Sequence, residues 1–422
     1  MIMIYLSPLV IIGLVIAIAL FAGARRERAR LASMSPEQQW QDQQIAATYQ
    51  MGSMQRIYEA GKLRVLLCSE GVVTLKKGQA EAIRWDQVEA LWKDVSLSHG
   101  SDSSDTYQYT LVRNDGVKLE YSNKITDIEL LGRKIEQEVT RHLLPAALAA
   151  ATAGHNVVFG DITVSTHTIS AEAGRKTLPF SELEHIAMDE EVLDIYRKGE
   201  KRAWHHQQVS QIPNPAILQE IVDHLQQEEV RRELPQVIAA YTTGTPIVFG
   251  DLSLSLQGVE IDQGKERVPW SEIKSIDVKE QEVSIRLWSK LLYWKTLPRW
   301  MTPNAAMLKE LAAHIMQVRL RATQAHIDDQ LPQVIASYTA GIPINFGRIT
   351  LSTQGVSIDQ GKKFLPWHEV KRIRIEAFIG GEQVVVGKKG WIISWQVLPM
   401  ADISNIDLLK AFVARMQSGI IV

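Results

Sequence analysis

The stretch LPQVIAAY at residues 234–241 returns as LPQVIASY at residues 331–338. Two further markers follow each copy in the same order: PIVFG at 246–250 returns as PINFG at 343–347, and VPW at 268–270 returns as LPW at 365–367. A fainter series precedes both copies, with LP at 144–145, VFG at 158–160 and LPF at 178–180. Three markers that recur in one order indicate that whole domains are repeated.

The clearest repeat runs from about residue 233 to residue 317. Leu234, Val237, Ile238 and Tyr241 recur at helical spacing and predict a short opening helix with Pro235 in its first turn. Seven segments with strand character follow, at 247–249, 252–256, 259–261, 267–270, 273–278, 283–287 and 294–297. Thr302-Pro303-Asn304 then predicts the start of an amphipathic helix. The pattern is mainly β with α, an α+β class of antiparallel strands closed by a helix.

Three segments of this unit carry a family resemblance: GVEID at 258–262, VPWSEI at 268–273 and PNAAML at 303–308. They resemble a strand, a W-x-x-I step and the capping helix of bacterial pleckstrin-homology-like (PH-like) domains, including membrane-anchored families of unknown function. The resemblance implies a bent sheet of about seven strands with a C-terminal helix in each unit. It also implies that loops at the open end contact ligands.

The markers divide the chain into four tandem units. IRWDQV at 83–88 imitates LPWHEV at 365–370, so residues 51–143 are expected to form a divergent first unit, closed by a helix at 125–143. The other units are expected at 144–230, 231–328 and 329–422. Because residues 217–233 run directly into the next Leu-Pro helix, we expect helical joints between units. A polar, Gln-rich linker is expected within residues 25–50.

The N-terminal segment, residues 1–24, contains no charged side chain and is long enough to span a bilayer as a helix. Four arginines follow it: Arg25, Arg26, Arg28 and Arg30. The positive-inside rule predicts a single-pass anchor in the cell membrane, with the N-terminus outside and the later domains cytoplasmic. A cleaved signal peptide is the alternative, because Ala22-Gly23-Ala24 resembles a cleavage site, although the charge lies on the wrong side.

Composition argues against strong global electrostatics and against cysteine chemistry. The formal net charge is -2, so nucleic-acid binding is not expected. Cys68 is the single cysteine and follows an apolar run, so it is expected in the core. No catalytic motif stands out, and we expect neither an enzyme nor a cofactor or metal. His205 and His206 are expected as a surface pair, and the acidic turn at 189–191 as a solvated hairpin.

A basic segment with aromatic residues recurs between the last two strands of the later units. The candidate residues for binding lipid or a partner are Arg197, Lys198, Lys201, Arg202 and Trp204 in the second unit, Arg286, Trp288, Lys290, Tyr293, Trp294 and Lys295 in the third, and Lys388, Lys389 and Trp391 in the fourth. Tryptophan combined with Lys or Arg suits a membrane interface. Alternatively, the tryptophans fill each core and the cations keep a hairpin soluble.

These features predict a membrane-anchored binding or scaffold protein that displays PH-like domains in the cytoplasm. The expected partners are the inner-leaflet surface with its anionic headgroups, a protein, or both. Repeated weak contacts would add avidity. One alternative is a structural spacer or assembly factor that uses its repeats only for protein contacts. A more distant alternative is an enzyme with a site between units.

Overall fold

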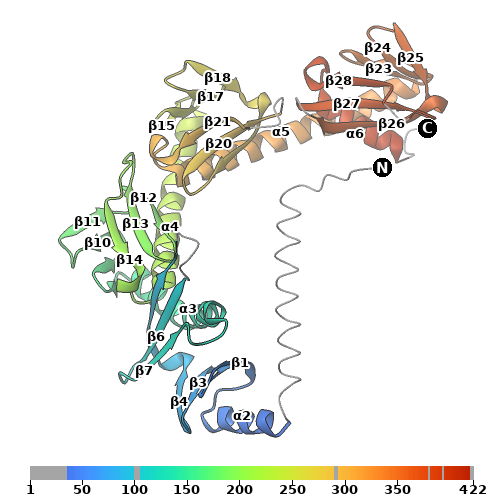
Figure 1. The fold of residues 1–422 in the computed structure, drawn as a ribbon. Coiled ribbons are helices and arrows are strands. Elements are labelled where there is room, and N and C mark those ends of the chain that lie inside the picture. The colour runs from blue at the N-terminus through green and yellow to red at the C-terminus, as the bar shows by residue number, and fades with distance from the viewer. Residues whose placement is uncertain (1–35, 99–104, 289–292, 379–380, 392–393, 419–422) are drawn as a thin grey trace. The chain divides into compact units, whose positions relative to one another are not determined.

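The computed structural model describes residues 36–98, 105–288, 293–378, 381–391 and 394–418. The described chain is mainly β with some helices, arranged as small antiparallel sheets in tandem (Figure 1). Along the chain, a four-stranded meander is repeatedly followed by a three-stranded meander. We call each such succession a sheet pair and number the pairs 1 to 4 in chain order. The predicted tandem of small β-rich units is therefore present.

Pairs 1 and 2 occupy the first half of the chain. The strands of pair 1 are β1 (Met54–Ala60), β2 (Leu63–Cys68), β3 (Gly71–Lys76), β4 (Gln79–Arg84), β5 (Val88–Ser96), β6 (Thr106–Arg113) and β7 (Lys118–Ser122). Those of pair 2 are β8 (Val157–Phe159), β9 (Ile162–Val164), β10 (Thr168–Ala171), β11 (Lys176–Pro179), β12 (Leu183–Met188), β13 (Val192–Arg197) and β14 (His205–Gln208). Each sheet joins neighbouring strands in sequence order, so β5 and β12 are edge strands.

Pairs 3 and 4 repeat the arrangement. The strands of pair 3 are β15 (Ile247–Phe249), β16 (Leu252–Leu254), β17 (Gly258–Ile261), β18 (Glu266–Pro269), β19 (Ile273–Val278), β20 (Glu282–Leu287) and β21 (Tyr293–Pro298). Those of pair 4 are β22 (Ile344–Phe346), β23 (Ile349–Ser352), β24 (Gly355–Ile358), β25 (Lys363–Pro366), β26 (Val370–Phe378), β27 (Gly381–Lys388) and β28 (Gln396–Pro399). Short 3-10 turns precede β5, β19 and β26 and follow β14, β21 and β28.

Three long helices connect the pairs: α3 (Ile128–Thr152), α4 (Pro215–Thr242) and α5 (Ala305–Thr339). Helix α2 (Pro36–Thr48) precedes pair 1, and α6 (Ile406–Gln417) closes pair 4. In α5, Leu308 and Leu311 pack into the core of pair 3, whereas Leu331 and Tyr338 pack into the core of pair 4. The prediction of helical joints is confirmed, but the prediction that the Leu-Pro dipeptides begin new helices is wrong. Pro145, Pro235 and Pro332 lie inside α3, α4 and α5, and α3 begins at Ile128 rather than at residue 125.

The repeated sequence markers meet at one backbone carbonyl. In pair 3, the Tyr241 hydroxyl and the Trp270 indole N–H both donate to the carbonyl of Ser255, at 3.3 and 2.7 Å. In pair 4, Tyr338 and Trp367 donate in the same way to Ser352, at 3.1 and 2.7 Å. The tyrosine of the Leu-Pro segment and the tryptophan of the Pro-Trp marker are thus two halves of one buried polar node.

The glycine of the VFG marker is required by a close backbone contact. Gly250 has φ +61°, and a Cβ there would lie 2.3 Å from the carbonyl oxygen of Met301. Gly347 has φ +76°, and its Cβ would lie 2.5 Å from the carbonyl oxygen of Asp402. Both the positive φ and the lack of room require glycine where the first hairpin meets the last 3-10 turn of the pair.

The first pair differs from the others in what covers it. Its first sheet has a core on each face, because Val65 and Leu67 face one cluster while Leu66 and Cys68 face another. Helix α2 adds Ala46 to the second cluster. The prediction that Cys68 is a core residue is confirmed, and burial raises the pKa of its thiol to about 11.

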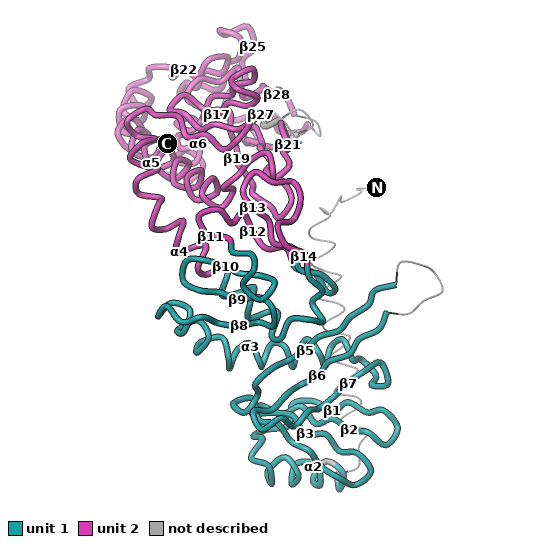
Figure 2. The backbone as a smooth tube through the Cα atoms, turned by 90° about the vertical axis from the view of Figure 1, so that its left-hand side faces the viewer, with its two compact units in different colours: residues 1–177, 188–193, 207–222 teal, residues 178–187, 194–206, 223–422 magenta. Residues whose placement is uncertain are grey.

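The chain divides into two compact units, shown in different colours in Figure 2. One comprises residues 1–177, 188–193 and 207–222, and the other residues 178–187, 194–206 and 223–422. The predicted anchor at 1–24 lies outside the described residues, as do Arg25, Arg26, Arg28 and Arg30. Among the helices that are described, none is long and apolar enough to cross a membrane.

Candidate functional site

The structure places the three predicted hairpins at one equivalent position in pairs 2, 3 and 4. The backbone N–H groups of Lys198, Trp288 and Lys389 donate to the carbonyls of Glu182, Glu272 and Glu369, at 2.9, 2.9 and 2.7 Å. Each glutamate lies in the 3-10 turn or bend just before the edge strand of the three-stranded sheet. The register of the repeats therefore brings the candidate residues to the same corner of each pair.

In pair 2 the basic residues differ in their surroundings, from an ion pair to an aromatic ring and open solvent. Arg197 forms an ion pair with Glu182 at 2.6 Å. Burial lowers the pKa of half-buried Lys198, in spite of the raising influence of Glu184. Lys201 and Arg202 are exposed, and the Lys201 ammonium lies 5.9 Å from the ring centre of Trp300.

Further aromatic contacts in this hairpin lie along β14. Trp204 is half-buried and meets the ring of His205 edge to face, at 6.1 Å between centroids. His205 is buried and His206 is exposed beside Asp194, at 2.7 Å. The prediction of a surface histidine pair is therefore wrong for His205, because successive strand residues point to opposite faces.

In pair 3 the aromatic residues organise the cations. The Arg286 guanidinium lies 4.5 Å from the ring centre of Tyr293 and donates to its hydroxyl at 2.7 Å. Trp294 packs against the core of pair 3, and Lys295 forms an ion pair with Glu266 at 2.5 Å. Lys290 lies outside the described residues.

Trp288 lies in a positively charged setting. Its ring centre is 4.9 Å from the Lys274 ammonium and 5.9 Å from the Lys410 ammonium of α6. Trp288 is half-buried, so its ring supports cations on its surface instead of filling the core. The core interpretation thus fits Trp294 and the interface interpretation fits Trp288.

In pair 4 the described part of the hairpin exposes its tryptophan. Trp391 is 52% exposed, and the Lys388 ammonium lies 5.6 Å from its ring centre. Lys388 also pairs with Glu369 at 2.7 Å, and this lysine holds the pKa of the Glu369 carboxyl below its usual value. Lys389 is exposed. Of the predicted aromatic residues, Trp391 therefore offers the largest apolar surface next to a cation.

A second kind of site lies where the start of one long helix meets the edge strand of the preceding pair. At the start of α4, Asn214 accepts a bond from the Leu91 N–H at 2.8 Å through its side chain and donates from its own N–H to the Leu91 carbonyl at 2.8 Å. Its amide also donates to the carbonyl of Glu89 at 3.2 Å. The free edge of β5 is thereby closed by an asparagine.

The corresponding contact at the start of α5 uses a buried carboxylate. Glu184 of β12 is 2% exposed. Its side chain accepts bonds from the backbone N–H groups of Asn304 and Ala305, at 2.6 and 3.1 Å, and from the Arg299 guanidinium at 3.0 Å. A carboxylate satisfies the unpaired N–H groups and the positive dipole end of a helix. Asn304 was expected to cap this helix, but it adopts a left-handed conformation and its side chain makes no capping bond.

The acidic turn at 189–191 is the β12–β13 hairpin, with Asp189 exposed as predicted, and its other two carboxylates also contact pair 1. Buried Lys93 of β5 pairs with Glu190 at 2.5 Å and with Glu136 at 3.6 Å. The Leu97 N–H donates to the Glu191 carboxylate at 2.6 Å. The sequence analysis missed this role because charged residues in a turn carry no signal of their distant partner.

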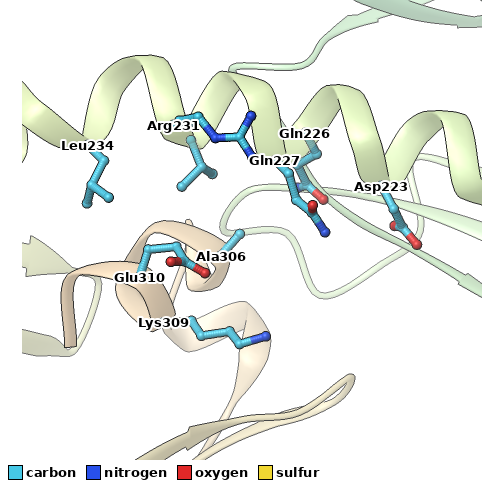
Figure 3. A pocket seen from close by; sticks show the side chains of 9 residues that line it. Asp223, Gln226, Gln227, Arg231, Leu234, Ala306, Lys309 and Glu310 are labelled. Atoms are coloured by element: carbon cyan, nitrogen blue, oxygen red, sulfur yellow. The ribbon is translucent and has the colours of Figure 1, made fainter. Parts of the chain in front are cut away.

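A groove of about 440 Å³ lies between α4 and α5. Figure 3 shows Gln227 and Arg231 on one helix and Lys309 and Glu310 on the other. Val230 and Leu234 supply apolar lining, and Gln226 is engaged with the carbonyls of Leu183 and Glu184 at 3.2 and 2.8 Å. The lining is therefore amphipathic, with both signs of charge, and it adjoins the Glu184 contact. Within the described residues, no group of three or more His, Cys, Asp or Glu side chains is placed to hold a metal ion.

Glu184 and Arg299 are the residues that sequence reasoning missed. The residue in the position of Glu184 is Glu89 in pair 1, Lys274 in pair 3 and Lys371 in pair 4, each the second residue of its edge strand. A position that changes sign between repeats cannot be recognised as a repeated marker. Its charge is informative only once the edge strand is known to receive a helix start.

Comparison with protein families supports the tandem organisation. A family model matches the chain at residues 53–229, 217–321 and 320–420. The chain belongs to the family of unknown function DUF6585. The first DUF6585 match spans pairs 1 and 2, whereas the second and third contain one pair each. Among curated proteins, none matches the chain.

Proposed function

We propose that the protein is a membrane-anchored scaffold of four PH-like units, at residues 51–143, 144–230, 231–328 and 329–422. The succession of four strands, three strands and a closing helix supports the PH-like assignment of each unit. The apolar segment at 1–24 and the arginines after it support a single-pass anchor with the units on the cytoplasmic side.

The shared helices carry this proposal. Val230 and Tyr241 of α4 and Leu308 and Leu311 of α5 lie in the core of pair 3. The other end of α5 supplies Ile327 to the core of pair 4. Helix α5 joins the two cores without a break, through residues 317–326, which pack into neither core. Such a construction suits a protein that presents several surfaces at defined intervals.

The contacts of the hairpins favour a protein as the binding partner. Arg197, Lys295 and Lys388 are each paired with a carboxylate, so part of the charge that would attract anionic lipid is neutralised. Trp391 remains exposed, and tryptophan is the residue type most enriched at binding hot spots. The inner leaflet is the second candidate, favoured by the exposed Lys389 beside Trp391.

The test uses the full chain in its native membrane, with a photo-crosslinking amino acid at position 391. A matched control carries it at Val248, an exposed apolar position in β15. We expect a discrete protein adduct from position 391 and none from position 248. Adducts of equal yield at both positions, or at neither, would contradict protein binding by this hairpin.

A second measurement distinguishes lipid binding from protein binding by the hairpin. The full chain is placed in nanodiscs of neutral or anionic lipid, and hydroxyl-radical footprinting follows Trp391 across a salt series. Protection that needs anionic lipid and disappears with salt would assign the hairpin to the inner leaflet. Equal labelling in both discs would remove lipid binding from the proposal.

A further inference from the structure

The position that receives a helix start in pairs 1 and 2 is also present in pair 4. There, edge strand β26 carries Lys371, Arg372 and Arg374, all of them exposed. In pair 2 the equivalent stretch holds buried Glu184, which contacts the start of α5. In the part of the chain that the structure describes, no helix start contacts β26 in this way.

An open groove of about 340 Å³ accompanies this edge, between β26 and α6. Its lining is apolar, with Ile373, Leu409 and Val413, and Arg374 and Lys410 stand at its border. Gln417 donates to the carbonyl of Ile373 at 3.1 Å. In pair 2, Gln226 donates to the carbonyls of Leu183 and Glu184, which lie nearer the start of the edge strand. The groove thus lies beside the same edge strand and closing helix as the filled site of pair 2, and Lys371, just before its lining residues on β26, takes the place of the glutamate.

The starts of the long helices differ from one another in exposure and in charge. Asn214 and Asn304 are half-buried against the preceding pair. The start of α3 carries Asp127 and Glu129, whose side chains are 51% and 52% exposed. Helix α3 follows β7 and closes pair 1, and in the described residues no earlier sheet pair stands before pair 1 to receive its start. It is therefore an exposed helix start that bears two carboxylates.

We propose that the groove of pair 4 binds the start of α3 from a second copy of this chain. The positive end of a helix dipole is repelled by Lys371 and Arg372 unless carboxylates reverse its charge. Asp127 and Glu129 supply that reversal, whereas the α4 and α5 starts have Asn-Pro-Ala and Asn-Ala-Ala. Pair 3 offers a weaker receiver, because its edge strand reads Lys274-Ser275-Ile276-Asp277.

The local ion pairs of the donor do not prevent this contact. Asp127 lies 3.5 Å from Arg56, and Glu129 lies 3.2 Å from Arg133. The Glu129 pair is exposed on both sides and contributes little free energy, and in the Asp127 pair the carboxylate is exposed while the Arg56 side chain is 20% exposed. A contact between the start of one copy and the groove of another is head-to-tail, so it adds copies in series and does not close as a symmetric dimer.

The test is a charge exchange in the full chain, solubilised in a neutral detergent at low salt. One variant is Lys371→Glu with Arg372→Glu, and the other is Asp127→Lys with Glu129→Lys. Sedimentation velocity across a concentration series measures association. We expect the wild type to grow with concentration and each variant alone to associate about tenfold more weakly. An equimolar mixture should regain association, because the acidic groove of one variant matches the basic start of the other.

The control is Lys362→Glu with Lys363→Glu, an equal charge change at two exposed residues of the same pair, the last of the β24–β25 turn and the first of β25. It should associate like the wild type. All of the substituted side chains are exposed, so circular dichroism is expected to show folded variants. A wild type that stays monomeric at every concentration, a control that weakens as much as the groove variant, or a mixture that fails to regain association would each overturn the proposal. None of these outcomes depends on the tryptophan hairpins.

Discussion

Helices α4 and α5 perform the same task with different lengths and different neighbours. Helix α4 has 28 residues and α5 has 35. Seven residues are close to two helical turns, so the additional length nearly preserves the helix face while adding about 10 Å along the axis. The additional turns are bare: residues 317–326 of α5 are all exposed, and Leu320 is 69% exposed. The corresponding middle of α4 contains buried Leu225 and Val230.

The edge strands beside the two helices differ in charge as well. Glu184 accepts bonds from the α5 start, whereas pair 3 has Lys274 at that position. Asn304 is half-buried and Asn405, the equivalent residue before α6, is exposed. An ammonium repels the positive end of a helix and a carboxylate attracts it. The comparison teaches that the α5 start, which meets a carboxylate on the edge strand, is held by the preceding pair, whereas the α6 start, which follows a pair with an ammonium there, is exposed.

The largest effect is expected for Glu184→Ala. Removing this carboxylate leaves Arg299, whose side chain is 13% exposed, without its ion-pair partner, and leaves two backbone N–H groups of the α5 start unsatisfied. Breaking one partner of a buried pair costs about 3–5 kcal/mol. Hydrogen exchange measured by mass spectrometry should show loss of protection at residues 305–312.

The matched control is Lys274→Ala, at the equivalent position of pair 3. Because Lys274 is exposed, we expect its free energy of unfolding to change by less than about 0.5 kcal/mol. If the two alanine variants lose protection equally, Glu184 does not hold the α5 start, and the contrast between the helices needs another cause.

A smaller effect is expected from pH, through the residue next to Glu184. Burial, aided by Arg299, lowers the pKa of His185 to about 3. The unfolded chain then binds more protons than the folded one between pH 6.5 and pH 3, so stability falls as pH falls through this range. The slope from one such group is at most about 1.4 kcal/mol per pH unit.

The measurement is urea unfolding between pH 7 and pH 4 for the wild type and for His185→Phe. Phenylalanine keeps the stacking on Tyr196, whose ring centroid is 4.7 Å away, and cannot titrate. The variant should lose less stability than the wild type on acidification. His206→Phe, at an exposed position, should keep the wild-type slope. Parallel slopes for all three proteins would show that His185 can be protonated in the folded state.

The sequence predicts the repeated parts of this fold because they obey local rules. Alternation located the strands, and the amphipathic helix predicted after Asn304 packs Leu308 and Leu311 into the core. Trp270 of the repeated Pro-Trp marker is buried and bonded to Ser255. The prolines misled, because Pro235 lies within a continuous helix and not at the start of one. Tertiary packing on both sides of that proline compensates for the lost helical bond.

The candidate sites were only partly predictable. Hairpin residues were identified by composition, and Trp391 is exposed as an interface residue should be. Composition could not distinguish it from Trp294, which packs against a core. The Glu184 contact joins residues more than a hundred positions apart, and no periodicity connects them. Such a contact becomes visible only when both repeats are placed in space.

A more local effect is expected when α5 is broken at its bare middle. Ala322→Pro removes a helical hydrogen bond at an exposed position, which costs about 3 kcal/mol in the helix itself. Because no core residue lies within 317–326, the sheets of pairs 3 and 4 should keep their hydrogen-exchange protection. Only the middle of α5 should exchange faster.

The comparison variant is Gln227→Pro in α4. This position lies one helical turn before Val230, which is buried, and before Arg231, which lines the groove. There, the break should spread into the core of pair 3 and reduce protection of β15 to β18. Equal spreading from both prolines would mean that the middle of α5 is coupled to its neighbours as tightly as that of α4.

The smallest effect on stability is expected at the hairpin beyond α5. Trp391→Ala removes a largely exposed ring and should change the free energy of unfolding by less than about 0.5 kcal/mol. Trp294→Ala in pair 3 removes a ring packed against the core and should cost about 1–3 kcal/mol. Thermal unfolding of both variants decides the matter. If Trp391→Ala is as damaging as Trp294→Ala, this ring is structural. If Trp391→Ala leaves the stability unchanged, the ring is not needed for folding, as expected of a residue that contacts a partner.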